Sequence, residues 1–81
     1  MTDPIETRLL QAFHTLFPSY TWDALRTGTP DSLAEWDSTN HFVLLELIEE
    51  TFEIRIPERD GGELLSFAAF AAYLTTHSTI R

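Results

Sequence analysis

Hydrophobic residues recur at helical spacing in the first stretch of the chain, from about Thr2 to Phe17. Pro18 ends this stretch. Thr2 or Asp3 marks its start, because a polar cap often precedes a proline in the first turn of a helix. The hydrophobic positions are Ile5, Leu9, Leu10, Phe13, Leu16 and Phe17. The pattern predicts an amphipathic helix that buries one face.

A second helical pattern extends from Ser38 to Phe52. An α-helix completes one turn in about 3.6 residues, which separates these residues into two faces. One face holds Leu44, Leu45, Leu47, Ile48 and Phe52, and the opposite face holds Ser38, Phe42, Glu46, Glu49 and Glu53. The natural N-terminal cap of this helix is Asp37 or Ser38.

The segment between these helices, residues 18–37, is a long connection that contains many turn-forming residues. Connections of this length tend to be functional or to contain a short turn of helix, and a turn near Thr21–Arg26 fits the sequence. We expect four large hydrophobic side chains to hold the connection against the core: Trp22, Leu25, Leu33 and Trp36.

Residues 53–56 alternate in polarity like a strand, but one short strand cannot form a sheet. We therefore expect an extended connector that places Ile54 and Ile56 in the core. A weak helical turn follows over residues 57–64. It contains Gly61-Gly62, and each glycine costs a helix about 1 kcal/mol relative to alanine, so this element is expected to be short and mobile.

The last helical pattern extends from Phe67 to about Thr76, and Ser66 is placed to cap it. Its inward positions are Phe67, Phe70, Ala71 and Leu74. Together the patterns predict an all-α fold in one domain over residues 1–81. The architecture expected is a small four-helix bundle, with three main helices and a short, weak helix before the last one.

The composition narrows the classes of partner. Thirteen acidic residues against five basic ones give a formal net charge of −8 over 81 residues. Nucleic acid is not an expected partner, because a phosphate backbone is met with lysine and arginine. Basic partner proteins fit this charge better. The beginning of the chain does not resemble a signal peptide, and the longest apolar runs, Phe42–Leu45 and Phe67–Leu74, are too short to span a bilayer, so the expected location is cytoplasmic.

Side chains suited to catalysis are few and scattered. Cysteine is absent, so a thiol nucleophile and a thiolate metal site are excluded. His14, His41 and His77 fall on three different predicted helices, which argues against a shared site. The paired glutamates of the Ser38–Phe52 helix lie on its polar side, where a solvated surface is a better interpretation than acid–base chemistry. We expect no enzyme activity and no bound metal.

Ser38 is the most informative residue. A serine hydroxyl at the start of a helix lies beside free backbone N–H groups and the positive end of the helix dipole, which favour a phosphate ester. The simpler alternative is that Ser38 is only an N-cap. Phe42 lies one turn further along the exposed face, among acidic residues that would suit a basic partner: Glu46, Glu49, Glu50 and Glu53.

The ordered set of motifs resembles the acyl carrier protein family. Asp37-Ser38 opens an acidic helix that ends in Leu-Ile-Glu-Glu-Thr-Phe at positions 47–52. An Ile56-Pro57 turn and a final short helix, Phe67–Leu74, follow at matching distances. The resemblance covers the whole chain and is strongest from Trp36 to Leu74.

The resemblance implies that Ser38 carries 4′-phosphopantetheine, transferred from coenzyme A by a phosphopantetheinyl transferase, and that Asp37 helps to position its hydroxyl. An acyl or aminoacyl group would be held as a thioester, added by a loading enzyme and passed to a downstream synthase or transferase. The carrier would be monomeric and would serve a specialised pathway, polyketide or related, rather than primary fatty-acid synthesis. The recognition residues would be Thr39, Phe42, Glu46, Glu49, Glu50 and Glu53.

The sequence departs from the family pattern at two places. Thr39 stands where a leucine usually follows the serine, which bears on recognition by the modifying enzyme. Gly61-Gly62 stands in what is usually a polar helix, and this could let the element move to admit a bound chain.

A second tripeptide, Asp31-Ser32-Leu33, matches the family motif literally. From Ser32 the Leu-Ile-Glu-Glu-Thr-Phe block comes six residues too late, and the preceding Gly28-Thr29-Pro30 indicates a turn. Ser38 is therefore the preferred attachment site. Two other classes stay open: a carrier-like interaction module without a prosthetic group and, with less support, a small enzyme or metal protein.

Overall fold

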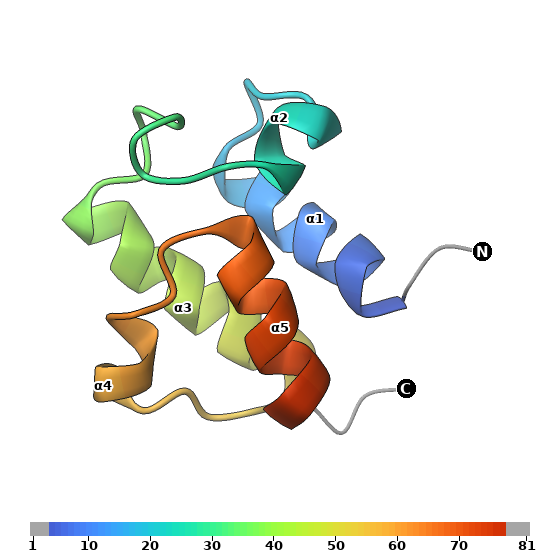
Figure 1. The fold of residues 1–81 in the computed structure, drawn as a ribbon, viewed down its shortest axis with the longest axis vertical. Coiled ribbons are helices and arrows are strands. Elements are labelled where there is room, and N and C mark those ends of the chain that lie inside the picture. The colour runs from blue at the N-terminus through green and yellow to red at the C-terminus, as the bar shows by residue number, and fades with distance from the viewer. Residues whose placement is uncertain (1–3, 78–81) are drawn as a thin grey trace.

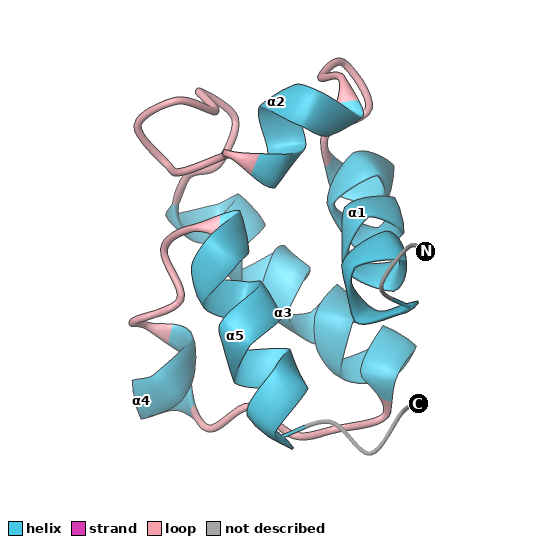
Figure 2. Ribbon diagram, turned by 45° about the vertical axis from the view of Figure 1, so that its right-hand side comes forward, coloured by secondary structure: helices cyan, strands magenta, loops and turns pink. Residues whose placement is uncertain are grey.

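The fold consists of helices joined by loops (Figure 1), in a computed structural model that describes residues 4–77. The helices are α1 (Pro4–Leu16), α2 (Trp22–Arg26), α3 (Ser38–Phe52), α4 (Glu58–Gly61) and α5 (Phe67–His77). Over these residues no β-strand forms (Figure 2), so the predicted all-α class is confirmed. The expected caps of the first helix, Thr2 and Asp3, lie outside the described residues.

The core forms where α1 packs against α2, α3 and α5. Phe13 lies at its centre, with ring centroids 5.1 Å from Phe67, 5.4 Å from Trp36 and 5.7 Å from Phe70. The buried hydrophobic residues are Leu9, Leu10, Ala12, Phe13, Phe17, Leu25, Leu33, Trp36, Leu44, Ile48, Phe52, Ile56, Leu64, Phe67, Phe70 and Leu74. Most of the apolar positions that helical spacing assigned to the inner faces of α1, α3 and α5 are in this set. The others are only partly buried and pack against it: Ile5, Leu16, Leu45, Leu47 and Ala71.

The connection between α1 and α3 contains a helix of its own. Thr21 caps α2, and its hydroxyl accepts a hydrogen bond from the backbone N–H of Ala24 at 3.1 Å. The described chain therefore has five helical segments, one more than the predicted four. Leu25, Leu33 and Trp36 hold the connection to the core as expected.

Trp22 does not share that role. It is 42% exposed, which corrects the expectation that it anchors the connection. A helix of five residues is little more than one turn long, so α2 buries its Leu25 side and leaves its first residue at the edge. Among the described residues no helix is long and apolar enough to cross a membrane.

The predicted extended connector leads from α3 to α4. Glu53 ends α3 in the left-handed conformation, with φ of 53°. Ile56 is then buried, and Ile54 is half-buried against the core. A hydrogen bond from the Tyr73 hydroxyl to Asp60 Oδ2, at 3.1 Å, joins α4 to α5.

Ser66 caps α5 as predicted, because its Oγ accepts a hydrogen bond from the backbone N–H of Ala69 at 2.9 Å. The loop before α3 is tied to the same helix end, where the N–H of Phe67 donates to the carbonyl of Gly28 at 3.0 Å. The 28–37 loop is therefore bonded to the start of α5 at its first residue and leads into the start of α3 at its last.

Candidate functional site

The start of α3 is fixed by Asp37, which is the N-cap. Its backbone is extended, and its Oδ1 accepts a hydrogen bond from the N–H of Asn40 at 2.9 Å. The Asn40 side chain returns to the loop and donates to the carbonyl of Glu35 at 2.6 Å. Of the two candidates for the cap, Asp37 takes the position, and Ser38 becomes the first residue of the helix.

Ser38 is exposed, and within the described residues its hydroxyl makes no hydrogen bond. A serine that capped the helix would use this oxygen to accept a backbone N–H. Here Asp37 performs that task, so the Ser38 hydroxyl is available to another molecule. It also lies at the positive end of a helix of 15 residues, where a negatively charged ester is favoured.

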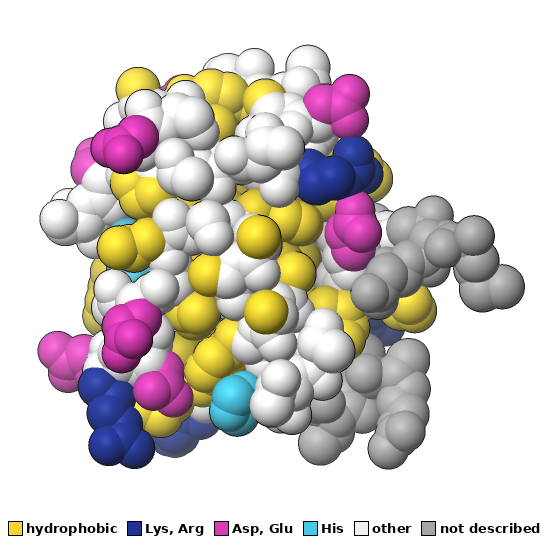
Figure 3. All heavy atoms as spheres, in the orientation of Figure 1, with side chains coloured by type: hydrophobic (Ala, Val, Ile, Leu, Met, Phe, Trp, Pro, Cys, Tyr) yellow, Lys and Arg dark blue, Asp and Glu magenta, His cyan; other side chains and the backbone are white. Residues whose placement is uncertain are grey.

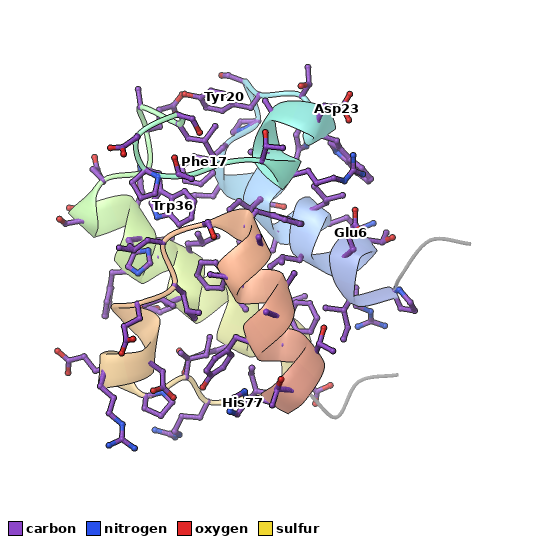
Figure 4. The ribbon with its side chains drawn as sticks, viewed as in Figure 1. Glu6, Phe17, Tyr20, Asp23, Trp36 and His77 are labelled. Carbon is purple, nitrogen blue, oxygen red and sulfur yellow. The ribbon has the colours of Figure 1, made fainter. Side chains whose placement is uncertain are left out.

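Ser38 stands at the rim of a surface groove of about 400 Å³. The lining comes from the loop before α3, from the first turn of α3 and from the connection between α4 and α5. The residues that line the groove are Pro30, Trp36, Asp37, Ser38, His41 and Leu65. Figure 4 labels Trp36 beside the beginning of α3, below the loop that precedes the helix.

His41 fixes one wall of this groove. The Trp36 indole Nε1–H donates to His41 Nδ1 at 2.9 Å, and His41 Nε2 lies 2.8 Å from the carbonyl oxygen of Gly61. Because a carbonyl only accepts, Nε2 carries the proton and Nδ1 is the acceptor. Both ring nitrogens are therefore engaged, and the ring lies nearly parallel to Trp36, at an interplanar angle of 20°.

The outer face of α3 combines apolar and acidic side chains, as predicted. Phe42 is 64% exposed, and Val43 beside it is 42% exposed. A second groove of about 300 Å³ lies along this face and is lined by Phe42, Leu45, Glu46, Glu49, Ile56 and Glu58. The acidic residues Glu46, Glu50 and Glu53 are exposed to solvent, and so is Thr39.

Glu49 departs from the expected position on this face. It is half-buried, and its Oε2 accepts a hydrogen bond from the backbone N–H of Ile56 at 2.7 Å. The carboxylate thus satisfies a donor that the extended connector leaves without a strand partner. Helical spacing could not reveal this bond, because it depends on where the chain goes after α3 has ended.

Ser32 is held in a turn. Its Oγ accepts a hydrogen bond from the N–H of Thr29 at 2.9 Å and lies 3.3 Å from the Thr29 carbonyl oxygen. Both residues of the Asp31-Ser32 pair are exposed, but no helix begins directly after them, since α3 starts only at Ser38. The turn inferred from Gly28-Thr29-Pro30 is therefore present.

His41 and His77 contact different parts of the fold. His77 stacks on Tyr73, with ring centroids 4.0 Å apart, whereas His41 is bound between Trp36 and Gly61. No cluster of three or more metal-ligating side chains occurs among residues 4–77. The sequence did not predict the Trp36–His41–Gly61 contacts. Trp36 and His41 are five residues apart, on either side of the start of α3, and no sequence pattern indicates that such a pair is hydrogen-bonded.

Comparisons with known proteins assign no family. A scan of the sequence against models of protein families gives no match, and a search among curated proteins gives none.

Proposed function

We propose that this protein is an acyl carrier protein that bears phosphopantetheine on Ser38. The observation that carries the proposal is the state of that side chain: an exposed hydroxyl without an intramolecular hydrogen bond, at the first position of a 15-residue helix that Asp37 already caps. A serine needed only for helix capping would occupy position 37 instead.

The residues at this site fit a phosphate ester. The ester would lie at the N-terminal end of α3, where backbone N–H groups and the helix dipole favour negative charge. Asp37 directs its carboxylate oxygen to the N–H of Asn40. Attachment forms a bond between Ser38 Oγ and phosphorus, breaks the pyrophosphate bond of coenzyme A, and releases the adenosine part, while the hydroxyl proton passes to a base of the transferase. When bound, the arm supplies a thiol that holds an acyl or aminoacyl group as a thioester.

The arrangement of helices supports the same proposal. Three longer helices, α1, α3 and α5, surround the core, and the short α4 precedes the last of them. This order of helices is compatible with the proposed acyl-carrier-type four-helix bundle, in which α2 would be an additional turn inside the long connection. Two motifs of the family resemblance lie at the boundaries of these elements. Asp37-Ser38 is at the start of α3, and Ile56-Pro57 is at the end of the connector that follows α3.

The exposed face of α3 would dock basic enzymes: the transferase, a loading enzyme and a downstream synthase or transferase. Phe42 provides an apolar contact, and the carboxylates of Glu46, Glu50 and Glu53 surround it at solvent-exposed positions. Such an interface combines an apolar centre with charge that steers association. Glu49 has a structural bond to Ile56, so its contribution to docking would be smaller.

Intact-mass measurement tests this function directly. The protein is incubated with coenzyme A and a phosphopantetheinyl transferase of broad specificity. We expect a single increment of one phosphopantetheine in the natural protein and in Ser32→Ala, and no increment in Ser38→Ala. Ser32 is the matched control, because it is an exposed serine that also follows an aspartate.

An increment that persists in Ser38→Ala would assign the modification elsewhere and overturn this site. If the natural protein gains no mass with any transferase, the carrier proposal fails. The exposed acidic and apolar face of α3 would then favour an interaction module without a prosthetic group.

A further inference from the structure

We propose that His41 is a pH-sensitive switch: protonation of its ring breaks the bond to Trp36 and turns the ring toward the groove at the start of α3. In the neutral protein the ring connects two other segments. Its Nδ1 accepts the indole N–H of Trp36 at 2.9 Å, and its Nε2 lies 2.8 Å from the carbonyl oxygen of Gly61. The switch is a property of the fold, so it does not depend on whether Ser38 is modified.

The two hydrogen bonds require a neutral ring. A carbonyl oxygen only accepts hydrogen bonds, so Nε2 carries the proton of the neutral imidazole and Nδ1 is the nitrogen that can gain one. After Nδ1 is protonated, two N–H donors face each other across the 2.9 Å that separates Nδ1 from the Trp36 nitrogen. The bond to Trp36 is then lost, whereas the bond to Gly61 needs only the proton that Nε2 already holds. The Trp36 side of the contact is therefore the side that depends on pH.

The packing around this bond shows which ring moves. Trp36 is 3% exposed, and the ring centroids of Phe13, Phe17 and Phe70 lie 5.4, 6.3 and 6.2 Å from it. Figure 4 labels Trp36 and Phe17 close together beneath the loop that precedes α3. His41 is only half-buried and lines the groove, so its ring has room to turn. Protonation therefore brings a positive charge and a free N–H donor to the groove and leaves the buried indole N–H without its acceptor.

On α3 and in the connections on either side of the groove, the charged groups do not replace this bond. Asp37 lines the same groove as His41, but its Oδ1 accepts the backbone N–H of Asn40. Glu35 of the loop and Glu63 after α4 are exposed. Within residues 4–77 none of these carboxylates forms a salt bridge with His41.

The side of the switch formed by α4 and α5 also lacks a free carboxylate. Asp60 of α4 accepts the Tyr73 hydroxyl at 3.1 Å and lies 3.9 Å from Arg59 Nε. From α5 the ring of Phe70 contacts His41, at a centroid distance of 6.3 Å, and this ring is uncharged. In the described part of the chain, a proton gained by His41 thus creates no ion pair that would hold the ring in place.

Nuclear magnetic resonance of the natural protein between about pH 5 and 8, where histidine side chains change charge, tests the switch. At the upper end we expect the nitrogen signals of His41 to show the proton on Nε2. On acidification the Trp36 indole signal should shift with the same midpoint as the His41 ring. Exchange of this indole proton with water should become faster by on the order of ten-fold, because its hydrogen bond is lost. The indole signal of Trp22, which is exposed on α2, is the internal control and should not shift with that midpoint.

Three variants assign the response to one residue. Glutamine offers an acceptor oxygen and N–H donors but does not titrate, so His41→Gln should make the Trp36 signal independent of pH. His77→Gln is the matched control, because it removes an exposed histidine that contacts Tyr73 instead of Trp36, and the response should persist. The response should also persist in Asp37→Asn, since asparagine caps a helix as well as aspartate does.

The inference fails on any of four results. The Trp36 signal might stay constant while the His41 ring titrates in the natural protein, which would show that the two are not coupled. The response could persist in His41→Gln or disappear in either of the other two variants, which would assign it to another group. A neutral ring with its proton on Nδ1 would contradict the bonding pattern. Loss of the core signals of Leu44 and Ile48 with the same midpoint would indicate unfolding of the whole domain. All measurements use the unmodified chain, so failure of the switch leaves the proposed function to its own test by intact mass.

Discussion

Glu49 and Glu53 lie about one turn apart near the end of α3, and both were expected to face solvent. Glu49 is instead half-buried and accepts a hydrogen bond from the backbone N–H of Ile56, whereas Glu53 is exposed as expected and ends the helix with a positive φ. By contrast, the cap at Asp37 was predictable, because it requires only residues next to one another in sequence. The bond of Glu49 was not predictable in this way, because its partner, Ile56, lies beyond the point where the chain changes direction.

Tyr73 is expected to make stability depend on pH in the alkaline range. Burial, the hydrogen bond to Asp60, and the negative charges of Asp60 and Glu49 raise its pKa above the ordinary value of 10.0. As pH rises, the unfolded chain loses this proton before the folded protein does. The free energy of unfolding therefore has its full Tyr73 contribution below pH 10.0 and declines as pH rises toward the raised pKa.

Urea unfolding at a series of pH values measures this decline. All five basic residues are arginine, so no lysine titrates in the same range. Tyr73→Phe should be less stable near neutral pH, by about 1 kcal/mol for the lost hydrogen bond, and its stability should fall less steeply above pH 10. An equally steep fall in this variant would contradict the assignment to Tyr73.

At the scale of elements, the short α4 was predicted, but the role of its glycines was not. Helix propensity treats Gly61 and Gly62 alike, as two residues that weaken a helix. In the structure Gly61 is buried against Leu45, and its carbonyl accepts the bond from His41. Gly62 is exposed. The first glycine allows α4 to approach α3 closely, a reason that only the packing supplies.

Gly61→Ala and Gly62→Ala should therefore change stability in opposite directions. A Cβ at position 61 would lie 2.8 Å from Leu45 Cδ1, so we expect a loss of about 1 kcal/mol or more. A Cβ at position 62 meets its nearest atom, the Glu58 carbonyl oxygen, at 3.7 Å. The backbone there is already helical, so the substitution should stabilise by about 0.4–1 kcal/mol.

Urea denaturation of the two variants provides the comparison. Equal destabilisation of both would mean that backbone freedom, rather than contact with Leu45, explains Gly61. A stabilised Gly61→Ala would show that Leu45 moves aside at no cost, and α4 would then not depend on this close approach.

At the scale of the whole molecule, charge is distributed unevenly. The formal net charge is −8, and Arg26 is paired with Glu6 at 2.6 Å and with Asp23 at 3.0 Å. Figure 3 shows basic and acidic side chains together near α4, at the lower left, and hydrophobic side chains along α5. On the outer face of α3 the exposed carboxylates of Glu46 and Glu50 take part in no salt bridge within the described residues.

Neutralising that face should slow the loading of Ser38. In Glu46→Gln with Glu50→Gln, the rate constant for loading at low salt should fall by on the order of ten-fold, because steering toward a basic enzyme is weakened. The dependence of the rate on salt should also become shallower. Mass spectrometry of samples quenched at successive times, at several salt concentrations, gives the rate constant for loading and its dependence on salt.

A control with the same change in net charge uses exposed positions of α1, in Gln11→Lys with Thr15→Lys. If this control slows loading as much as the α3 variant does, net charge rather than the α3 face governs association. Unchanged unfolding midpoints in both variants are needed for the comparison, and surface substitutions of this kind usually alter stability by less than about 0.5 kcal/mol.

The sequence by itself determined the all-α class, the three main helices, the buried faces of α1, α3 and α5, and the caps at Asp37 and Ser66. These features follow from periodicity and from residues close together in the chain. Only the tertiary structure decided that Trp22 stays exposed, that Glu49 is bound by Ile56, and that His41 joins Trp36 to Gly61. Each of these features depends on how segments come together when the core is buried. The periodicity of the sequence within one helix does not indicate that arrangement.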